Sequence, residues 1–506
     1  MILATAPVYQ LPPTPEVNWH GFAPELILFA AAILIIIGRS VVRNSPTVYA
    51  MSYFTAAVGI FGAGVFTLAQ WIVWHDSGAY TTFAGMIVVD GFSIFIRVVV
   101  LLALVLVLVL SYPYLRREDI PGPEYVALVM LSAVGMMLMG SAFNLITVFL
   151  ALEILSIALY VLVAIDRKRF TSQEAGLKYF VLGAVASAFF LYGVALTYGA
   201  TGSTSIPRIG VFLGAHGADG LVLAGMVLMI VGLGFKVAAV PFHMWAPDVY
   251  DGAPTPITAF MAAATKAAAF AAILRVLLDA FPSQVHEWRP VIFTLAALSL
   301  LVGSIAALVQ TNIKRMLAYS SISHAGYILI AVQAGTPKGV SAALFYLFTY
   351  AFMTIGTFAI VLTMAPPGDD SHQLSSFKGL ARRRPVLAGA LTFLLLAQAG
   401  VPLTGGFVAK LTVFSAGIQA RQYALVIIGV LSAAIAAFFY LRVVVVMYLS
   451  DDTAEAGNPG PTRPAIPIPV ATGIVVAIAV VATLYLGVSP GNILDFARDA
   501  QLIGLR

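Results

Sequence analysis

Long apolar stretches recur along the whole chain and are separated by short breaks rich in glycine, proline or charge. A helix that crosses a membrane takes about 20 predominantly apolar residues. Stretches of helical length lie near 24–38, 48–73, 91–111, 123–140, 143–164, 173–197, 220–248, 256–280, 291–310, 317–333, 339–364, 385–418, 422–448 and 467–488. The pattern predicts an all-α polytopic membrane protein with about 14 transmembrane helices.

The composition excludes several classes of protein. Of the 506 residues, 61% are hydrophobic and only 10% are charged, whereas soluble domains carry roughly 25% charged residues. An ordinary cytosolic enzyme, a disordered protein and a nucleic-acid binder are therefore excluded. The chain has no cysteine, so it holds no cysteine-ligated iron–sulfur cluster, disulfide or catalytic thiol.

Basic residues are unevenly distributed between the two sets of loops. Loops after odd-numbered stretches contain 14 Lys and Arg residues, and loops after even-numbered stretches contain 4. Because Lys and Arg accumulate in cytoplasmic loops, the odd loops are predicted to be cytoplasmic. Both termini then lie on the non-cytoplasmic side, and we expect a multi-pass protein of the bacterial cell (inner) membrane.

Four charged residues lie deep within apolar sequence, namely Glu153, Lys236, Lys266 and Lys410. A charge near the bilayer centre costs about 2.5–3.5 kcal/mol on insertion scales, so it indicates function by default. The alternative is static ion pairing. Three lysines face a single deep carboxylate, however, so at most one can pair with Glu153 at a time. Buried groups whose partners change are what proton transfer requires.

Four further basic residues lie nearer the ends of their stretches. For these we expect the alkyl stem to lie along apolar surface while the charged group reaches the membrane interface. They are Arg97, Lys178, Arg275 and Arg442.

Two of the deep lysines lie beside helix breakers. Pro241 follows Lys236, and Gly400, Pro402 and Gly406 precede Lys410. Glycine and proline interrupt helices, and broken helices in corresponding positions of two halves indicate inverted repeats around a mid-membrane site. The seventh and twelfth stretches are five apart, which predicts two inverted five-helix repeats. The expected divisions are helices 1–3 at 1–122, a first repeat at 123–280, a second at 281–448, and a loop with helix 14 at 449–506.

Two histidines are candidates for a proton relay, because histidine titrates near neutral pH. His243 follows Pro241, and His324 lies among serines and tyrosines in the tenth stretch. A structural role is an equal alternative for each of them. No histidine has a partner at metal-ligand spacing, so no metal is predicted.

The residues alone therefore indicate an ion or proton translocator with a buried lysine–glutamate axis and two broken helices. Transfer of an ion or proton against the membrane potential needs a source of energy, here called the driver. The chain contains neither a GxxxxGK[ST] loop for ATP nor a convincing GxGxxG dinucleotide motif. The driver is expected to be an ion gradient or a set of partner subunits.

Two segments resemble the antiporter-like membrane subunits of respiratory complex I, the proton-pumping NADH:quinone oxidoreductase. They are FKVAAVPFHMWAPDVYDGAPTPITAFMAAATKAAAF and NIKRMLAYSSISHAGYIL. The first contains Pro-Phe-His-x-Trp-x-Pro-Asp, which is common to these subunits, and its continuation VYDGAP favours the N-type subunit (subunit 2 in mitochondria and chloroplasts). A lysine at position 410 and the lack of a long extra C-terminal helix also favour this type.

The resemblance implies a role for each deep charge. Glu153 would modulate the proton affinity of Lys236 by pairing with it, Lys266 would link two half-channels, and Lys410 would be the exit-side proton donor. It also implies partner subunits that carry FMN, iron–sulfur clusters and quinone, with no redox centre in this chain. The expected partners are the other membrane subunits of the complex, membrane lipids and, indirectly, the quinone pool, with no nucleic acid.

Two other functions remain open at this point. A subunit of a multi-subunit cation/proton antiporter would use the same architecture without a redox partner. A passive scaffold would not need buried lysines at their insertion cost.

Overall fold

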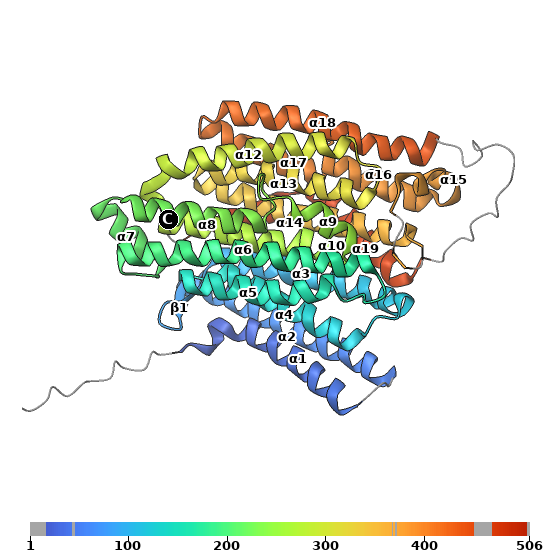
Figure 1. The fold of residues 1–506 in the computed structure, drawn as a ribbon, viewed down its shortest axis with the longest axis horizontal. Helices are drawn as coiled ribbons and strands as arrows, with labels where there is room; N and C mark the ends of the chain where they lie inside the picture. The colour runs from blue at the N-terminus through green and yellow to red at the C-terminus, as the bar shows by residue number, and fades with distance from the viewer. Residues whose placement is uncertain (1–16, 43–45, 367, 370–371, 450–467, 503–506) are drawn as a thin grey trace, which may run out of the picture.

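The computed structural model describes residues 17–42, 46–366, 368–369, 372–449 and 468–502. Over these residues the chain forms long, roughly parallel helices (Figure 1). Eleven of the described helical segments are long and apolar enough to cross a membrane. The prediction of an all-α polytopic membrane protein is confirmed, whereas the count of about 14 crossings and the repeat boundaries stay predictions. The predicted polar loop at 449–466 lies, from residue 450 on, outside the described residues.

The first part of the chain, where it is described, contains five α-helices, one short 3-10 helix and one hairpin. Its elements are η1 (Trp19–Phe22), α1 (Ala23–Val41), α2 (Pro46–Ser77), β1 (Tyr80–Thr82), β2 (Ile87–Val89), α3 (Gly91–Glu118), α4 (Gly122–Ser141) and α5 (Leu145–Val163). The strands pair antiparallel, with Tyr80 opposite Val89. Asp90 caps α3 in a reciprocal arrangement with Ser93, which explains why this helix begins directly after β2.

The middle of the chain contains the first broken helix. Its elements are α6 (Phe170–Thr201), α7 (Ile206–His216), α8 (Gly220–Lys236), α9 (Trp245–Gly252), α10 (Thr255–Phe260), η2 (Met261–Thr265), α11 (Lys266–Arg275), η3 (Val276–Ala280) and η4 (Pro282–Gln284). Of these, η2 and η3 are π-helical turns that interrupt one continuous helical segment from α10 to η3.

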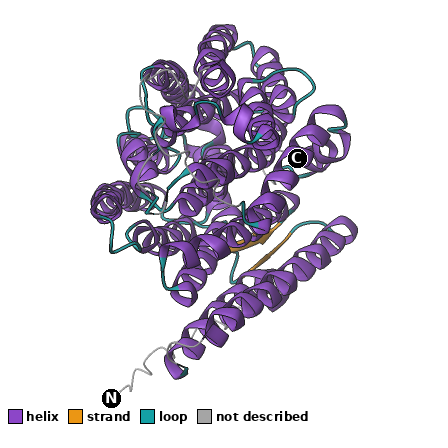
Figure 2. Ribbon diagram, turned by 90° about the vertical axis from the view of Figure 1, so that its right-hand side faces the viewer, coloured by secondary structure: helices purple, strands orange, loops and turns teal. Residues whose placement is uncertain are grey.

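The last part contains the second broken helix. Its elements are α12 (Val285–Leu308), α13 (Ile313–Ala334), α14 (Pro337–Met364), η5 (Leu374–Phe377), α15 (Leu380–Arg383), α16 (Pro385–Ala399), α17 (Gly405–Gln419), α18 (Tyr423–Leu449), α19 (Val470–Val488) and α20 (Gly491–Asp499). Figure 2 looks nearly along these helices.

Two helical segments form the centre of the bundle. The apolar windows of α10–η3 and α14 are completely buried, whereas only 28% and 33% of those of α2 and α19 are buried. The central segment is rich in alanine, with Ala262–Ala264 and Ala267–Ala269 all buried. Small side chains let neighbouring helices approach closely, so this sequence suits the position with the most helical neighbours.

The two breaks differ in where they place their lysine. Lys236 is the last residue of α8, so its break follows it, whereas Lys410 lies in α17 after the break between α16 and α17. At that second break Gly400 has φ +93°, and a Cβ on Gly406 would lie 1.8 Å from the Ala397 carbonyl oxygen. Both positions therefore require glycine, and the sharp turn brings Lys410 back against the end of α16.

Arg97 and Arg275 do not reach an interface, contrary to the prediction from the sequence. Arg97 is fully buried and its Nε lies 2.8 Å from Glu25 Oε1. Arg275 is also fully buried and makes two bonds to the Asp90 carboxylate, at 3.0 and 3.1 Å. Glu25 and Asp90 lie far from these arginines in the sequence, although Asp279, 3.6 Å from Arg275, is only one turn away. The positions of the arginines alone therefore suggested an exposed group.

Lys178 and Arg442 fit the interfacial expectation better. Lys178 is partly exposed and pairs with Glu174 and Asp248. Arg442 donates to the carbonyl oxygens of Leu308 and Gln310 at the end of α12, where the negative end of the helix dipole favours a cation.

A buried carboxylate at the Arg-rich end ties distant elements together. Asp369 accepts hydrogen bonds from the Thr255 backbone and hydroxyl and from Tyr114, and lies 3.5 Å from Arg169. Burial alone would raise the pKa of Asp369, but the positive charge of Lys314 and the His372 contact outweigh it and hold the pKa below its usual range. The contacts join α3, the start of α6 and the start of α10.

Candidate functional site

Lys236 is held in the interior by neutral groups. Its Nζ donates to Ser156 Oγ at 2.7 Å and to Tyr179 OH at 3.0 Å. The same nitrogen lies 5.7 and 5.0 Å from the ring centres of Tyr160 and Tyr179, where an ammonium group is attracted to the aromatic face. The end of α8, α5 and α6 thus together enclose one cation.

Glu153 lies near this lysine but does not form an ion pair with it. It is on α5, one turn before Ser156, and its Oε1 is buried with no hydrogen-bond partner among the described residues. The ion pairs of the described chain do not join Glu153 to Lys236, and two of the three N–H donors of the lysine go to the hydroxyls of Ser156 and Tyr179. The direct pair that the resemblance implied is therefore absent from this structure.

Lys266 lies at the centre of the bundle, directly after the π-helical turn η2. Its Nζ donates to the carbonyl and hydroxyl oxygens of Ser321 on α13, and lies 5.5 Å from the Tyr350 ring centre. The preceding residue, Thr265, has a buried hydroxyl without a hydrogen-bond partner among the described groups. Buried polar atoms of this kind are usually satisfied by water, and π-helical turns are frequent at functional sites.

His324 connects α13 to two other helices. Its Nδ1 lies 2.7 Å from Tyr346 OH on α14, and its Nε2 lies 3.2 Å from Tyr440 OH on α18. The Tyr440 hydroxyl also bonds to Ser320 and donates to Gln398 Oε1 at 3.4 Å. Ser320 and His324 are one turn apart on α13, next to the serine that holds Lys266. The same turn of α13 therefore contacts both Lys266 and Tyr440.

Lys410 is held by the end of a helix. Its Nζ donates to the carbonyl oxygens of Gln398 and Ala399 at 3.0 and 2.8 Å, in the last turn of α16. The final carbonyls of a helix lack intrahelical donors and carry the negative end of its dipole. The ammonium group also lies 4.7 Å from the Tyr327 ring centre. The break between α16 and α17 thus creates the acceptor for the lysine that follows it.

Polar groups follow one another along α13 from Lys266 to Lys410, although not as an unbroken chain of hydrogen bonds, whereas an aromatic gap separates Lys236 from Lys266. Between the first two lysines, Trp245 stacks on Tyr179 at 4.7 Å and donates its indole N–H to the Phe235 carbonyl. The next polar contact towards Lys266 is made by Tyr250, whose hydroxyl lies 3.5 Å from Ser321 Oγ. An indole nitrogen can donate a hydrogen bond but cannot accept one, so it cannot pass a proton on. Proton transfer across this gap therefore requires water.

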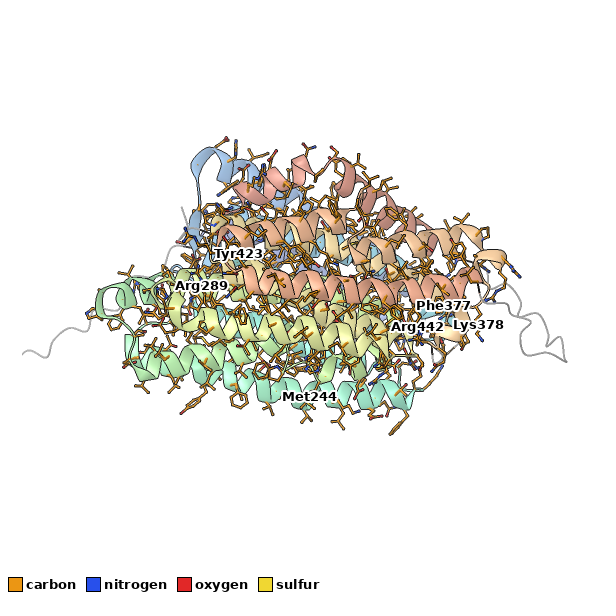
Figure 3. The ribbon with its side chains drawn as sticks, turned by 90° about the horizontal axis from the view of Figure 1, so that it is seen from above. Met244, Arg289, Phe377, Lys378, Tyr423 and Arg442 are labelled. Carbon is orange, nitrogen blue, oxygen red and sulfur yellow. The ribbon has the colours of Figure 1, made fainter. Side chains whose placement is uncertain are left out.

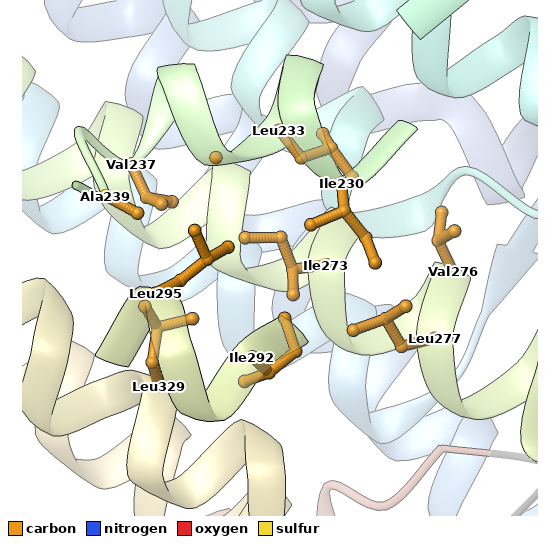
Figure 4. Close-up of a pocket in the computed structure, with 11 residues that line it drawn as sticks. Ile230, Leu233, Val237, Ala239, Ile273, Val276, Leu277, Ile292, Leu295 and Leu329 are labelled. Atoms are coloured by element: carbon orange, nitrogen blue, oxygen red, sulfur yellow. The ribbon is translucent and has the colours of Figure 1, made fainter. Parts of the chain in front are cut away.

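A dry cavity lies beside the end of α8. This cavity of about 10 Å³ is lined only by apolar and glycine residues, which come from α8 and the break after it, α11, η3, α12 and α13, and include Leu233, Ile273 and Leu295 (Figure 4). It has space for about one water and offers it no polar side chain, so it stays dry. The hydrogen-bond partners of Lys236 come from α5 and α6 instead.

The structure does not bring His243 to the other candidate residues. Its Nδ1 contacts the Pro241 carbonyl oxygen at 3.3 Å in the break after α8. The next residue, Met244, is 77% exposed and lies at the outer edge of the molecule (Figure 3). Of the two predicted relay histidines, only His324 lies in the buried polar chain.

Several site residues escaped the sequence reasoning. Ser156 could have been found, because it lies three residues after Glu153 and so on the same face of a helix. Tyr179, Tyr346, Tyr350 and Tyr440 could not, since each is a tyrosine within an apolar stretch and only the packing shows that its hydroxyl or ring meets the axis.

Metal ligands are not clustered in the part of the chain that the structure describes. No group of three or more His, Cys, Asp or Glu side chains there could hold a metal ion.

Comparisons with known proteins agree on one family. Residues 142–436 match the family model described as "NADH:quinone oxidoreductase/Mrp antiporter, TM". The chain is 42% identical to NADH-quinone oxidoreductase subunit N of Trichlorobacter lovleyi, over 96% of this chain and 97% of that protein. It is 41% identical to the protein of the same name from Mycobacterium bovis, over 97% and 99%.

Solved structures show the same fold. A chain of respiratory complex I from Thermus thermophilus, with bound aureothin, matches with a TM-score of 0.76 and 36% identity, over 93% of this chain and 98% of that one. A chain of the Mrp complex from Dietzia matches with a TM-score of 0.81 but only 22% identity, over 95% and 96%. The second likeness shows the fold alone.

Proposed function

The chain belongs to the subunit N family of NADH-quinone oxidoreductases, within the wider NADH:quinone oxidoreductase/Mrp antiporter membrane family, and from this premise we propose that it translocates protons along its buried lysine axis. It is a multi-pass membrane subunit of a bacterial respiratory complex. Quinone reduction in partner subunits supplies the energy, and FMN and iron–sulfur clusters belong to those partners. Its termini lie on the non-cytoplasmic side, as the basic loops predict.

One observation carries the proposal. The ammonium groups of Lys236, Lys266 and Lys410 are each held by neutral acceptors, namely hydroxyl or carbonyl oxygens, rather than by carboxylates. A lysine held this way can lose its proton without leaving a buried carboxylate unpaired, which would cost several kcal/mol. The fully buried arginines Arg97 and Arg275 are paired with acids instead, so the three lysines are the buried basic groups suited to exchange protons.

The proposed cycle starts at Glu153. A change in a neighbouring subunit moves the carboxylate of Glu153 relative to Lys236 and so changes the electrostatic stabilisation of the ammonium group. The proton crosses the gap beside Trp245 through water and reaches Lys266. It then passes by Ser321, His324, Tyr440 and Gln398 to Lys410 and leaves on the outer side. His243 takes no part in this path.

The main alternative is a subunit of a multi-subunit cation/proton antiporter. The two functions differ in the complex that contains the chain, so purification of the native complex in mild detergent distinguishes them. We expect flavin absorbance and the electron paramagnetic resonance signals of reduced iron–sulfur clusters to copurify with the chain. A complex that contains this chain without flavin or clusters, and exchanges cations for protons, would establish the antiporter.

A further inference from the structure

An apolar groove runs between α2 and α3 on the outside of the bundle. It consists of two hollows, of about 480 and 380 Å³. Small residues of α2, including Ala56, Ala57 and Gly64, form one wall, and Val105, Val109 and Leu101 of α3 form the other. The two hollows follow one another along both helices and are together called the groove, and Ala471 of α19 also lines the larger one.

The groove has the length of a membrane's hydrocarbon core. Along α3 its lining extends from Ile94 to Tyr112. At about 1.5 Å rise per residue, this stretch of helix measures about 27 Å, compared with about 30 Å for the hydrocarbon core of a bilayer. A ligand that lies in the groove is therefore in contact with the lipid tails over its whole length.

Aromatic side chains mark both ends of the groove. Tyr53 and Tyr112 line one end, with Tyr49 packed against both, and Trp71 and Phe496 line the other. Tyrosine and tryptophan gather where headgroups meet hydrocarbon. The two ends therefore lie at the two faces of the membrane.

A cation without an acidic partner stands at the tyrosine end. Arg116 is exposed, and its guanidinium lies 4.8 and 5.1 Å from the ring centres of Tyr112 and Tyr49. Among the described residues no carboxylate pairs with Arg116, whereas its neighbours Arg117 and Arg39 pair with Glu118 and Glu124. The two tyrosine rings fix the position of the guanidinium and leave its hydrogen-bond donors available.

We propose that this groove binds an anionic phospholipid of the leaflet on the Arg116 side. The phosphate accepts hydrogen bonds from Arg116, which can bind two phosphate oxygens at once. One acyl chain lies between α2 and α3, against Ala57 and Val105. The guanidinium of Arg116 lies at the depth of the lipid headgroups, and the groove lies at the depth of the acyl chains. This arrangement matches the charged and apolar parts of a phospholipid.

A partner helix fits the groove less well. An apolar helix brings no group of opposite charge to Arg116, whereas a phospholipid brings its phosphate.

The groove can be tested in the intact complex with a photoreactive phenylalanine analogue at position 57. Irradiation in native membranes should attach a phospholipid to the peptide that contains this position. A crosslink to another protein, or to no ligand, would overturn the proposal.

Quantification of the lipids that copurify tests the cation. Native mass spectrometry of the purified complex should show that Arg116→Gln lowers retained anionic phospholipid about fivefold, since one basic residue at a membrane surface contributes about that factor. Arg116→Lys should restore most of it, and Ala57→Trp should remove it by filling the groove. Arg167→Gln removes another exposed arginine from the same end and should change nothing. Unchanged retention in Arg116→Gln and Ala57→Trp would contradict the site.

Discussion

Proton flux through this chain should fall at least about 100-fold when Lys266 is replaced by methionine, since a positioned acid–base group contributes about 10²–10⁴-fold to proton transfer. Methionine fills a similar volume but holds no proton, and Lys266 is the central buried lysine of the bundle. The measurement is the number of protons pumped per electron by the assembled complex in proteoliposomes.

Lys266→Arg separates proton transfer from charge. Arginine keeps the positive charge and can still donate to Ser321, but it is not deprotonated in proteins. We expect Lys266→Arg to pump as poorly as Lys266→Met. The control is Lys338→Arg, because Lys338 is exposed and also donates to a serine, Ser415, at 2.7 Å. Normal pumping by Lys266→Arg would show that the site needs only a fixed cation.

Tyr440→Phe should interrupt the second half of the axis and lower flux through this chain at least about tenfold, as loss of one relay group does. The substitution keeps the ring and removes only the hydroxyl that contacts Ser320, His324 and Gln398. Protons pumped per electron are again the readout. Tyr423→Phe on the same helix removes an exposed hydroxyl and should have no effect.

A double variant tests whether Tyr440 and His324 act in one path. Groups that act as a unit show effects that do not add. The loss in His324→Leu/Tyr440→Phe should therefore equal the larger of the two single losses. If the two losses multiply, the two residues serve separate paths.

The sequence predicts the class of fold and the buried lysines well, for a physical reason. Apolar stretches of membrane length are a strong signal because lipid offers the backbone no hydrogen-bond partners, and a charge within such a stretch stands out. Lys236, Lys266 and Lys410 are all buried in the structure, as their sequence positions predicted.

The partners of these residues could not be predicted in the same way. Arg97 finds Glu25, and Arg275 finds Asp90, across large separations along the chain, so the two arginines were wrongly placed at an interface. The serine and tyrosine acceptors of the lysines raise the same difficulty, since a hydroxyl in an apolar stretch looks the same whether it faces a lysine or a backbone carbonyl. Lys236 illustrates this difficulty most clearly, because it donates to the hydroxyl of Ser156 and not to the nearby carboxylate of Glu153.

The central claim is that the three lysines act in series on one path. The most direct test compares protons pumped per electron in Lys236→Ala with the triple variant Lys236→Ala/Lys266→Ala/Lys410→Ala, in the assembled complex in proteoliposomes. In a series, one missing member stops the flow, so we predict that the single variant loses as much pumping as the triple variant. A normal ratio in Lys236→Ala, or a clearly larger loss in the triple variant, would contradict the account.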